Sequence, residues 1–165
     1  MAQAWLVHRW TTPVYRFCRR MLSHDEDARD AAQETLVKVL KNLHRYDQTR
    51  SFSTWMFGIA RNTCIDEHRR RKRRGHKAPA EKEIACNAPT PLQEVGNKLE
   101  SERLVECLDD LAPLYREVIV LYHFEHKKYA EIAEILEVPI GTVMNRIFRA
   151  RKKLKDAYKA RGGQR

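Results

Sequence analysis

The sequence predicts an all-α protein made of two small helical domains joined by a flexible linker. Apolar residues recur three and four positions apart through most of the 165 residues, which is the period of a helix, and no stretch alternates like a strand. Gly and Pro are sparse, with six of each, and several of them cluster between residues 75 and 96. We therefore predict a first domain at residues 1–74, a linker at 75–98 and a second domain at 99–165.

The first domain should hold its helices in a simple order. Thr12 and Pro13 are typical of a helix cap and first helical residue, so we expect a helix to begin there. An apolar stripe predicts a long helix over residues 27–46, and a polar loop over residues 47–53 follows. Thr54 should then cap a helix that runs into a dense series of basic residues.

The second domain should contain helices near residues 101–111 and 114–124, followed by a pair near 129–136 and 142–160. The short turn between the last two predicts a helix-turn-helix. Its second helix should present an outward face with Thr142, Met144, Asn145, Arg146, Phe148 and Arg149. On such a face Asn and Arg can read base edges, while Thr and Arg reach phosphates. The alternative is an ordinary amphipathic helical pair with basic ends.

The charge balance favours a polyanionic partner. Lys and Arg number 32 against 22 Asp and Glu, which gives a net charge of +10. Nucleic acid or an acidic membrane surface fits such a balance, and an excess of surface lysine is the plain alternative. There is no run of about 18 apolar residues and no signal peptide, so we expect no membrane insertion and a cytoplasmic protein.

We predict no cofactor and no metal site. The four cysteines are widely spaced, as expected for free thiols in a reducing cytosol. Zinc could bind Cys64 with His68, or His76 with Cys86, but neither pair has a second pair at zinc-finger spacing.

Three features of the first domain suggest binding surfaces. The basic series Arg69 to Arg74 is either a solvated helix end or a track for phosphates. Phe52 and Trp55 lie beside a polar loop, where aromatic rings can stack on the bases of melted DNA; Trp55 fits a core position equally well. The long helix has an acidic half around Asp30, which is either solvated or a docking face for a basic protein.

Three motifs resemble the extracytoplasmic-function (group IV) sigma factors of the sigma-70 family. They are the series from Asp27 to Thr35, the series from Phe52 to Thr63 with Ile65 and Asp66, and the series from Pro139 to Val143 with Arg146 and Arg149 to Arg151. The resemblance implies a non-catalytic specificity subunit of RNA polymerase. Its partners would be core RNA polymerase, promoter DNA and an anti-sigma factor.

The resemblance also implies a role for each binding surface. The polymerase's clamp helices would contact Asp30, Gln33, Glu34 and Lys38. The loop from Asp47 to Phe52 would hold a flipped-out base of the non-template strand. The −10 element as a whole would contact Asp47, Arg50, Ser51, Phe52, Trp55, Arg61, Asn62, Asp66, Arg69 and Arg70. The −35 element would contact Thr142, Met144, Asn145, Arg146, Phe148, Arg149 and Arg151. The linker would thread the RNA exit path of the polymerase.

The chain departs from the family pattern at a few positions. Leu36 replaces an aromatic residue, and Met144 with Asn145 replaces a basic residue followed by Ser. Glu137 stands where the helix-turn-helix usually has Gly. If that turn needs a positive φ, Glu costs about 1 kcal/mol there.

Two other functions compete with this interpretation. A helix-turn-helix regulator that acts without polymerase would need neither an acidic docking helix nor an aromatic loop. A nuclease that uses His24, Asp25 and Glu26 is the enzyme alternative, but these residues lie at a helix start, where acidic side chains are ordinary caps.

Overall fold

Every regular element in the described part of the chain is helical, as predicted. In a computed structural model, residues 2–75 and 98–162 are described, with backbone alone for 98–103. These residues form seven α-helices and two short helical turns and no strand. Most of the predicted linker lies outside the described residues.

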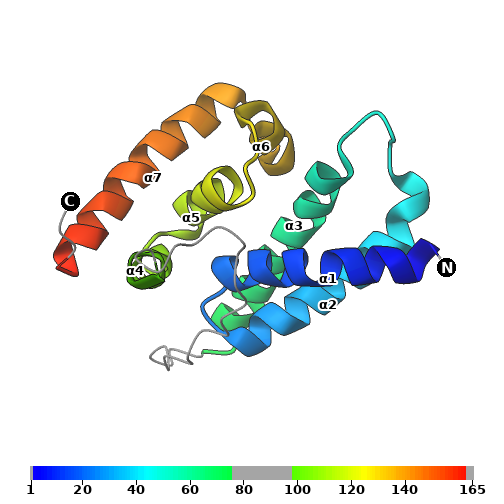
Figure 1. Cartoon of the computed structure of the whole chain (residues 1–165), viewed down its shortest axis with the longest axis horizontal. Coiled ribbons are helices and arrows are strands. Elements are labelled where there is room, and N and C mark those ends of the chain that lie inside the picture. Colours follow the sequence, from blue (N-terminus) through cyan, green and yellow to red (C-terminus); the bar gives the residue numbers. More distant parts are fainter. Residues whose placement is uncertain (1, 76–97, 163–165) are drawn as a thin grey trace.

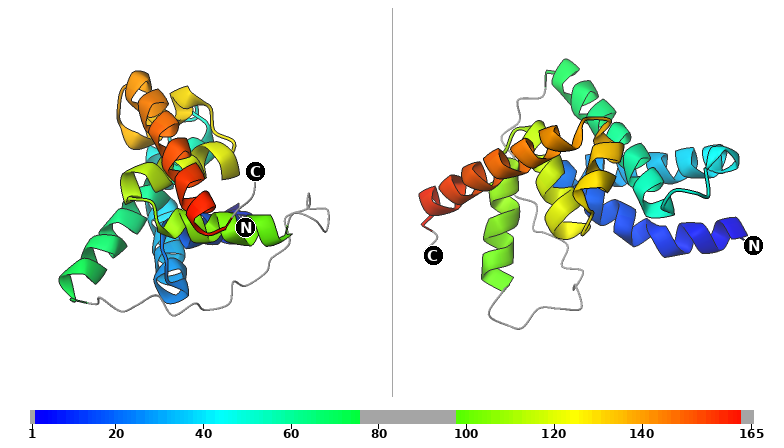
Figure 2. Two further views of the ribbon diagram at one scale, coloured as in Figure 1. Left: turned by 90° about the vertical axis from the view of Figure 1, so that its left-hand side faces the viewer. Right: turned by 90° about the horizontal axis from the view of Figure 1, so that it is seen from above.

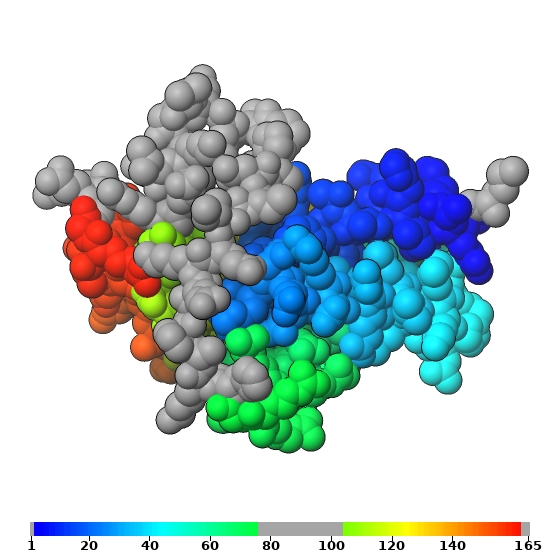
Figure 3. Space-filling model, turned by 90° about the horizontal axis from the view of Figure 1, so that it is seen from below, coloured from blue at the N-terminus to red at the C-terminus, as the bar shows by residue number. Residues whose placement is uncertain are grey.

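The first domain consists of three long helices, α1 (Ala2–Met21), α2 (Asp25–Asn42) and α3 (Phe52–Arg73), with a short 3₁₀ turn, η1 (Leu43–Arg45), after α2. Helix α1 packs on α2, and α2 packs on α3 (Figure 1). Seen from below, α1, α2 and the end of α3 share one broad face (Figure 3). Three acidic residues occupy the first turn of α2, where the helix dipole favours negative charge.

Two expected helix starts are wrong. Pro13 lies inside α1 rather than at its beginning, and Thr54 is buried in the first turn of α3, which begins after Ser51. Proline has no N–H to donate to the preceding turn, so it destabilises a helix interior. The apolar stripe from Leu6 to Met21 packs on both sides of Pro13, and this burial keeps α1 continuous.

The second domain contains α4 (Lys98–Asp109), α5 (Pro113–Ile119), a π-helical turn η2 (Val120–Phe124), α6 (Tyr129–Leu136) and α7 (Ile140–Ala160). Pro113 begins α5 at the position where its missing N–H costs least. Helices α5 and α6 both pack against α7 (Figure 1). The pair α6 and α7 forms the predicted helix-turn-helix.

The turn between α6 and α7 has a left-handed residue at the position where Glu replaces the usual Gly. Glu137 adopts φ 55° and ψ 45°, and the Val138 N–H donates to the carbonyl oxygen of Ala133 at 3.1 Å. This is a helix end that normally favours glycine. The strained backbone therefore sits directly before the helix that was predicted to read DNA.

The two domains are packed against one another in this structure. Helix α6 lies against α3, and α5 contacts α1 (Figures 1 and 2). One continuous set of buried apolar side chains extends from Phe17 and Met56 in the first domain to Ile132 and Ile147 in the second. The sequence predicted two separate cores and gave no sign of this contact.

Candidate nucleic-acid interface

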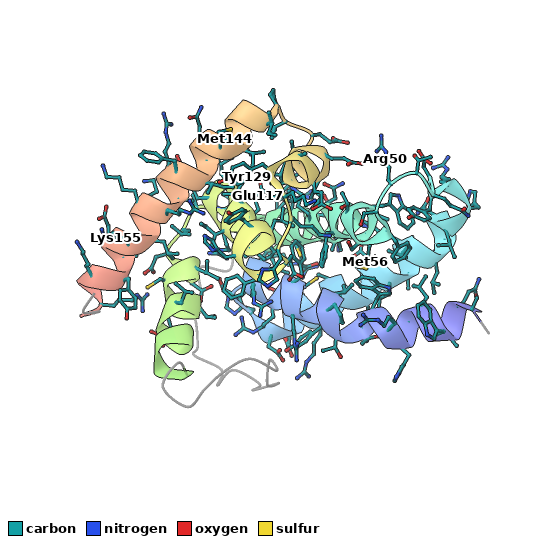
Figure 4. All side chains as sticks on the ribbon, turned by 45° about the horizontal axis from the view of Figure 1, so that its top comes forward. Arg50, Met56, Glu117, Tyr129, Met144 and Lys155 are labelled. Atoms are coloured by element: carbon teal, nitrogen blue, oxygen red, sulfur yellow. The ribbon has the colours of Figure 1, made fainter. Side chains whose placement is uncertain are left out.

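The outward face of α7 is exposed and mixes apolar with basic side chains. Met144 is 52% exposed and Phe148 is 74% exposed, and Asn145, Arg149 and Arg151 are exposed beside them. The opposite face is anchored by buried residues, Val143, Ile147 and Ala150. Met144 and Lys155 mark the two ends of this helix in Figure 4. A helix held this way can enter a major groove without losing its packing.

Arg146 differs from the other residues predicted on this face. Its side chain is only 22% exposed, and its Nη1 donates to Glu117 Oε1 at 3.4 Å. Thr142 is half-buried as well. The predicted face therefore divides into exposed residues, such as Phe148 and Arg149, and the partly buried Arg146, which forms an ion pair with Glu117 of the same domain.

The loop between α2 and α3 is held by its own hydrogen bonds. Asp47 Oδ1 accepts from the Thr49 N–H at 2.9 Å, and the Tyr46 hydroxyl donates to the Arg50 carbonyl oxygen at 2.5 Å. The bond from the Thr49 backbone lowers the pKa of the Asp47 carboxyl, because it favours the charged form. The loop is therefore pre-shaped in the free protein.

A cluster of aromatic rings packs at the two ends of this loop. Phe52 lies 5.2 Å from Tyr46, 5.7 Å from Trp55 and 5.6 Å from Trp10, measured between ring centroids. Trp10 belongs to α1 and was missed by the sequence analysis, because nothing in its own neighbourhood connects it to the loop. Phe52 and Trp55 are half-buried, so each has both a packed and an accessible side.

A surface pocket of about 400 Å³ opens beside this cluster. Its lining has two basic residues, two amides, one aromatic ring and one aliphatic side chain. In that order they are Lys38 and Arg45, Asn42 and Asn62, Trp55, and Ile59. Such a lining suits a planar, polar ligand that can stack on Trp55. Lys38, Trp55 and Asn62 were predicted site residues; the other three were missed, because their positions follow only from how α2 crosses α3.

The charged residues in the second half of α3 differ in exposure and in their ion pairs. Asn62 and Arg69 are exposed, and Asp66 is half-buried. Arg70 is engaged with Glu34 at 3.4 Å and with Glu67 at 3.3 Å. The predicted DNA residue Arg70 and the predicted polymerase residue Glu34 thus form an ion pair with each other.

The outer face of α2 is open to solvent. Asp30 and Gln33 are exposed, and Val37 between them and the helix end is 47% exposed. Glu34 also pairs with Lys38 at 2.8 Å. This hydrogen bond from Lys38, with help from Arg70, lowers the pKa of the Glu34 carboxyl. The face is therefore a mixed surface of charged, polar and apolar groups.

The alternative sites predicted from the sequence have ordinary structural roles where they are described. Asp25 pairs with Arg29 at 2.9 Å and accepts from the Tyr15 hydroxyl, so the suggested nuclease residues begin α2 and form no separate cluster. Among the side chains that the structure describes, in residues 2–75 and 104–162, no group of three that could hold a metal ion occurs. His76 and Cys86 lie outside the described residues.

The described helices and cysteines show neither a membrane span nor a disulfide. None of the helices searched is long and apolar enough to cross a membrane. Cys18, Cys64 and Cys107 are free and buried. A hydrogen bond with Cys18, together with burial, raises the pKa of the Cys64 thiol well above its ordinary value, which makes it a poor nucleophile.

Comparison with known proteins agrees with this geometry. Residues 6–74 match the family description "Sigma-70 region 2", and residues 101–154 match "Sigma-70, region 4". The chain is 33% identical over 160 residues to the ECF RNA polymerase sigma factor SigW of Bacillus subtilis, covering 91% of this chain and 85% of that protein. It is 30% identical to SigM of the same organism, covering 93% of each.

Two solved structures share the fold. The sigma factor RpoE of Bartonella quintana, in complex with the anti-sigma factor NepR, superimposes with a TM-score of 0.78 at 23% identity, over 94% of this chain and 96% of that one. CnrH, in complex with the cytosolic domain of CnrY, gives a TM-score of 0.70 at 27% identity, over 96% and 88%. The chain belongs to the extracytoplasmic-function sigma factors of the sigma-70 family.

Proposed function

We propose that this sigma factor joins core RNA polymerase through the outer face of α2 and holds a promoter at two points. The first domain recognises and melts the −10 element, and the second domain reads the −35 element. The protein carries no chemistry of its own, because nucleotide transfer belongs to the polymerase. It acts in the cytoplasm, where the polymerase works.

The observation that carries this proposal is the pocket beside the aromatic cluster. A base that leaves the DNA stack needs an aromatic surface and polar groups for its edge. Trp55 offers the surface, and Asn42 and Asn62 offer amides that can donate and accept hydrogen bonds. Arg45 and Lys38, which also line the pocket, carry positive charges that suit the adjoining phosphates. We assign this pocket to a flipped-out base of the −10 region.

The second contact lies on α7. Arg149 and Asn145 can form paired hydrogen bonds with base edges, and Phe148 and Met144 can meet thymine methyl groups. Arg151, which also lies over the Tyr122 ring at 5.1 Å, suits a phosphate at the groove edge. An anti-sigma factor is a further expected partner, because RpoE of Bartonella quintana was solved with one.

Binding to core polymerase tests the proposal. Asp30→Lys reverses an exposed charge on the outer face of α2 and breaks no ion pair described above, unlike a change at Glu34. The matched control is Asp156→Lys, which makes the same change on the exposed surface of α7. We expect Asp30→Lys to weaken core binding by about tenfold or more, a loss typical for one partner of an interfacial charge pair, and the control to bind like the wild type. A wild-type chain that fails to bind core polymerase contradicts the proposal.

A further inference from the structure

The outward face of α7 changes in character along the helix. Five exposed residues at spacings of three and four form one row on this face: Asn145, Phe148, Lys152, Lys155 and Lys159. The first two belong to the surface that we propose for reading bases, and the last three are all lysines. Figure 4 shows Lys155 on the side of α7 that faces away from the other helices. The base-reading surface therefore continues into three exposed cations, which we call the lysine stripe.

The lysine stripe is not neutralised by its surroundings. Among the side chains that the structure describes, no carboxylate forms an ion pair with Lys152, Lys155 or Lys159. Asp156 is exposed next to the stripe and pairs with none of the three. Like charges three or four positions apart repel one another on a helix. The stripe therefore does not stabilise α7 in the free protein, and a bound polyanion would relieve the repulsion.

The described ion pairs of α7 lie on other sides of the helix. Arg146 pairs with Glu117 of α5 at 3.4 Å. Arg161 pairs with Glu106 of α4 at 3.2 Å and with Asp110, directly after α4, at 2.9 Å. Both arginines thus face the rest of the second domain, whereas the lysine stripe faces solvent. The unpaired cations are gathered on the face that we propose to meet DNA.

The geometry of a DNA duplex brings phosphates to the lysine stripe. Helix α7 has 21 residues, and a rise of 1.5 Å per residue places Lys159 about 21 Å along the axis from Asn145. The major groove is about 12 Å wide and curves around the duplex, so a helix that holds Asn145 at the bases leaves the groove before its C-terminal end. Its second half then meets the phosphates that border the groove. A lysine ammonium is a compact charge with three donors, which suits a phosphate from many directions.

We infer that the lysine stripe binds the phosphates of duplex DNA beside the bases that the first half of α7 reads. This inference rests on the proposed function, which places Asn145 and Phe148 at those bases. The stripe adds affinity that does not depend on base sequence, whereas Asn145 and Phe148 supply the sequence dependence. Phosphate contacts release counterions from the DNA, so this part of the affinity weakens as the salt concentration rises.

Lys155→Gln is the first test variant, and a triple variant adds Lys152→Gln and Lys159→Gln. Glutamine removes the charge but forms helices about as well as lysine, and all three positions are exposed, so the fold is retained. The matched control is Lys153→Gln, which removes one charge from the same helix. Lys153 lies off the stripe, 5.5 Å from the centre of the Tyr115 ring. Lys155→Gln and Lys153→Gln therefore have the same net charge and differ only in the side of α7 that loses it.

The test is the affinity of the full chain for a short random-sequence DNA duplex across a series of salt concentrations. The stripe is exposed in the free protein, so the measurement needs no polymerase. We expect the slope of log affinity against log salt to become less steep by about 0.9 with Lys155→Gln and by about 2.7 in the triple variant. Lys153→Gln should keep the wild-type slope.

Three results overturn the inference. One is an equal change of slope for Lys153→Gln and Lys155→Gln, and another is a wild-type slope in the triple variant. The third is a slope that depends on these lysines with a single-stranded oligonucleotide of the same length but not with the duplex, because the stripe would then bind a different form of nucleic acid.

Run-off transcription with core polymerase separates this inference from the proposed function. If the wild-type chain supports transcription but the triple variant keeps the wild-type slope, the lysine stripe is wrong and the proposed function stands. If the chain supports no transcription, the proposed function fails, whereas the salt series still decides whether the stripe binds duplex phosphates.

Discussion

Trp10 of α1 packs on Phe52, the first residue of α3, with ring centroids 5.6 Å apart and planes tilted by 49°. Phe52 in turn contacts Tyr46, whose hydroxyl donates to the Arg50 carbonyl oxygen. A residue near the N-terminus is therefore connected, through two rings and one hydrogen bond, to the loop that the sequence predicts to contact the −10 element.

Trp10→Ala should loosen this loop. Trp10 is only half-buried, so its removal costs less packing than the removal of a core Trp. We therefore expect the free energy of unfolding to fall by about 1 to 2 kcal/mol. Promoter melting, measured by permanganate reactivity of unpaired thymines, should fall further than core polymerase binding. Trp5→Ala is the control, because Trp5 is 66% exposed on the same helix. Equal behaviour of the two variants would show that Trp10 does not support the loop.

Arg116→Met should severely destabilise the second domain and its contact with α1. The buried guanidinium donates to the carbonyl oxygens of Leu108, Asp109, Leu111 and Met21 at 2.8 to 3.3 Å. Burial lowers the pKa of Arg116, and the nearby charges of Asp109 and Asp110 oppose this shift. Methionine leaves the carbonyl groups without a donor, at a cost of about 3 kcal/mol in urea unfolding. Arg161→Met, which removes only exposed ion pairs, should cost less than about 1 kcal/mol.

Glu137→Gly should stabilise the helix-turn-helix. Glu137 has φ 55°, where a side chain is strained and glycine is not. We expect a gain of about 0.5 to 1 kcal/mol in the free energy of unfolding, after allowing for the greater freedom of glycine when unfolded. Lys152→Gly, in the interior of α7, should lose about 1 kcal/mol instead. A loss at both positions would contradict the strain argument.

Phe148→Ala should weaken promoter binding and leave stability unchanged. The ring is 74% exposed in the free protein, so its removal should change unfolding by less than about 0.5 kcal/mol. If it meets a thymine methyl group, affinity of the protein for a −35 duplex falls by about 1 kcal/mol or more. Leu114→Ala removes another exposed apolar side chain, 42% exposed and on α5, and should leave affinity unchanged. Unaltered affinity of Phe148→Ala would remove the ring from the interface.

Much of the fold could be predicted from local patterns. The apolar periodicity of α2 and the turn at Glu137 are each determined within a few residues, so the long helix and the helix-turn-helix were predicted correctly. The start of α1 was not. The local preference of Pro13 for a first helical turn is weaker than the burial of the stripe on both sides of it.

The contacts between distant segments could not be predicted. Arg61 and Glu117 lie 56 residues apart, and no periodicity relates charges at that separation. The same is true of the pocket, which combines Asn42 of α2 with Ile59 of α3. Sequence patterns identify which face of a helix is polar, whereas the packing of the helices determines which polar groups meet.

Run-off transcription on genomic fragments tests the central claim most directly. Core polymerase is supplied with the wild-type chain, with the Asp30→Lys variant or with no added protein. We predict discrete transcripts that require the wild-type chain, that are strongly reduced by Asp30→Lys, and whose start sites share sequence elements near −10 and −35. Transcripts that do not depend on the chain, or binding of the chain to DNA fragments without any effect on transcription, would contradict a promoter-specificity subunit.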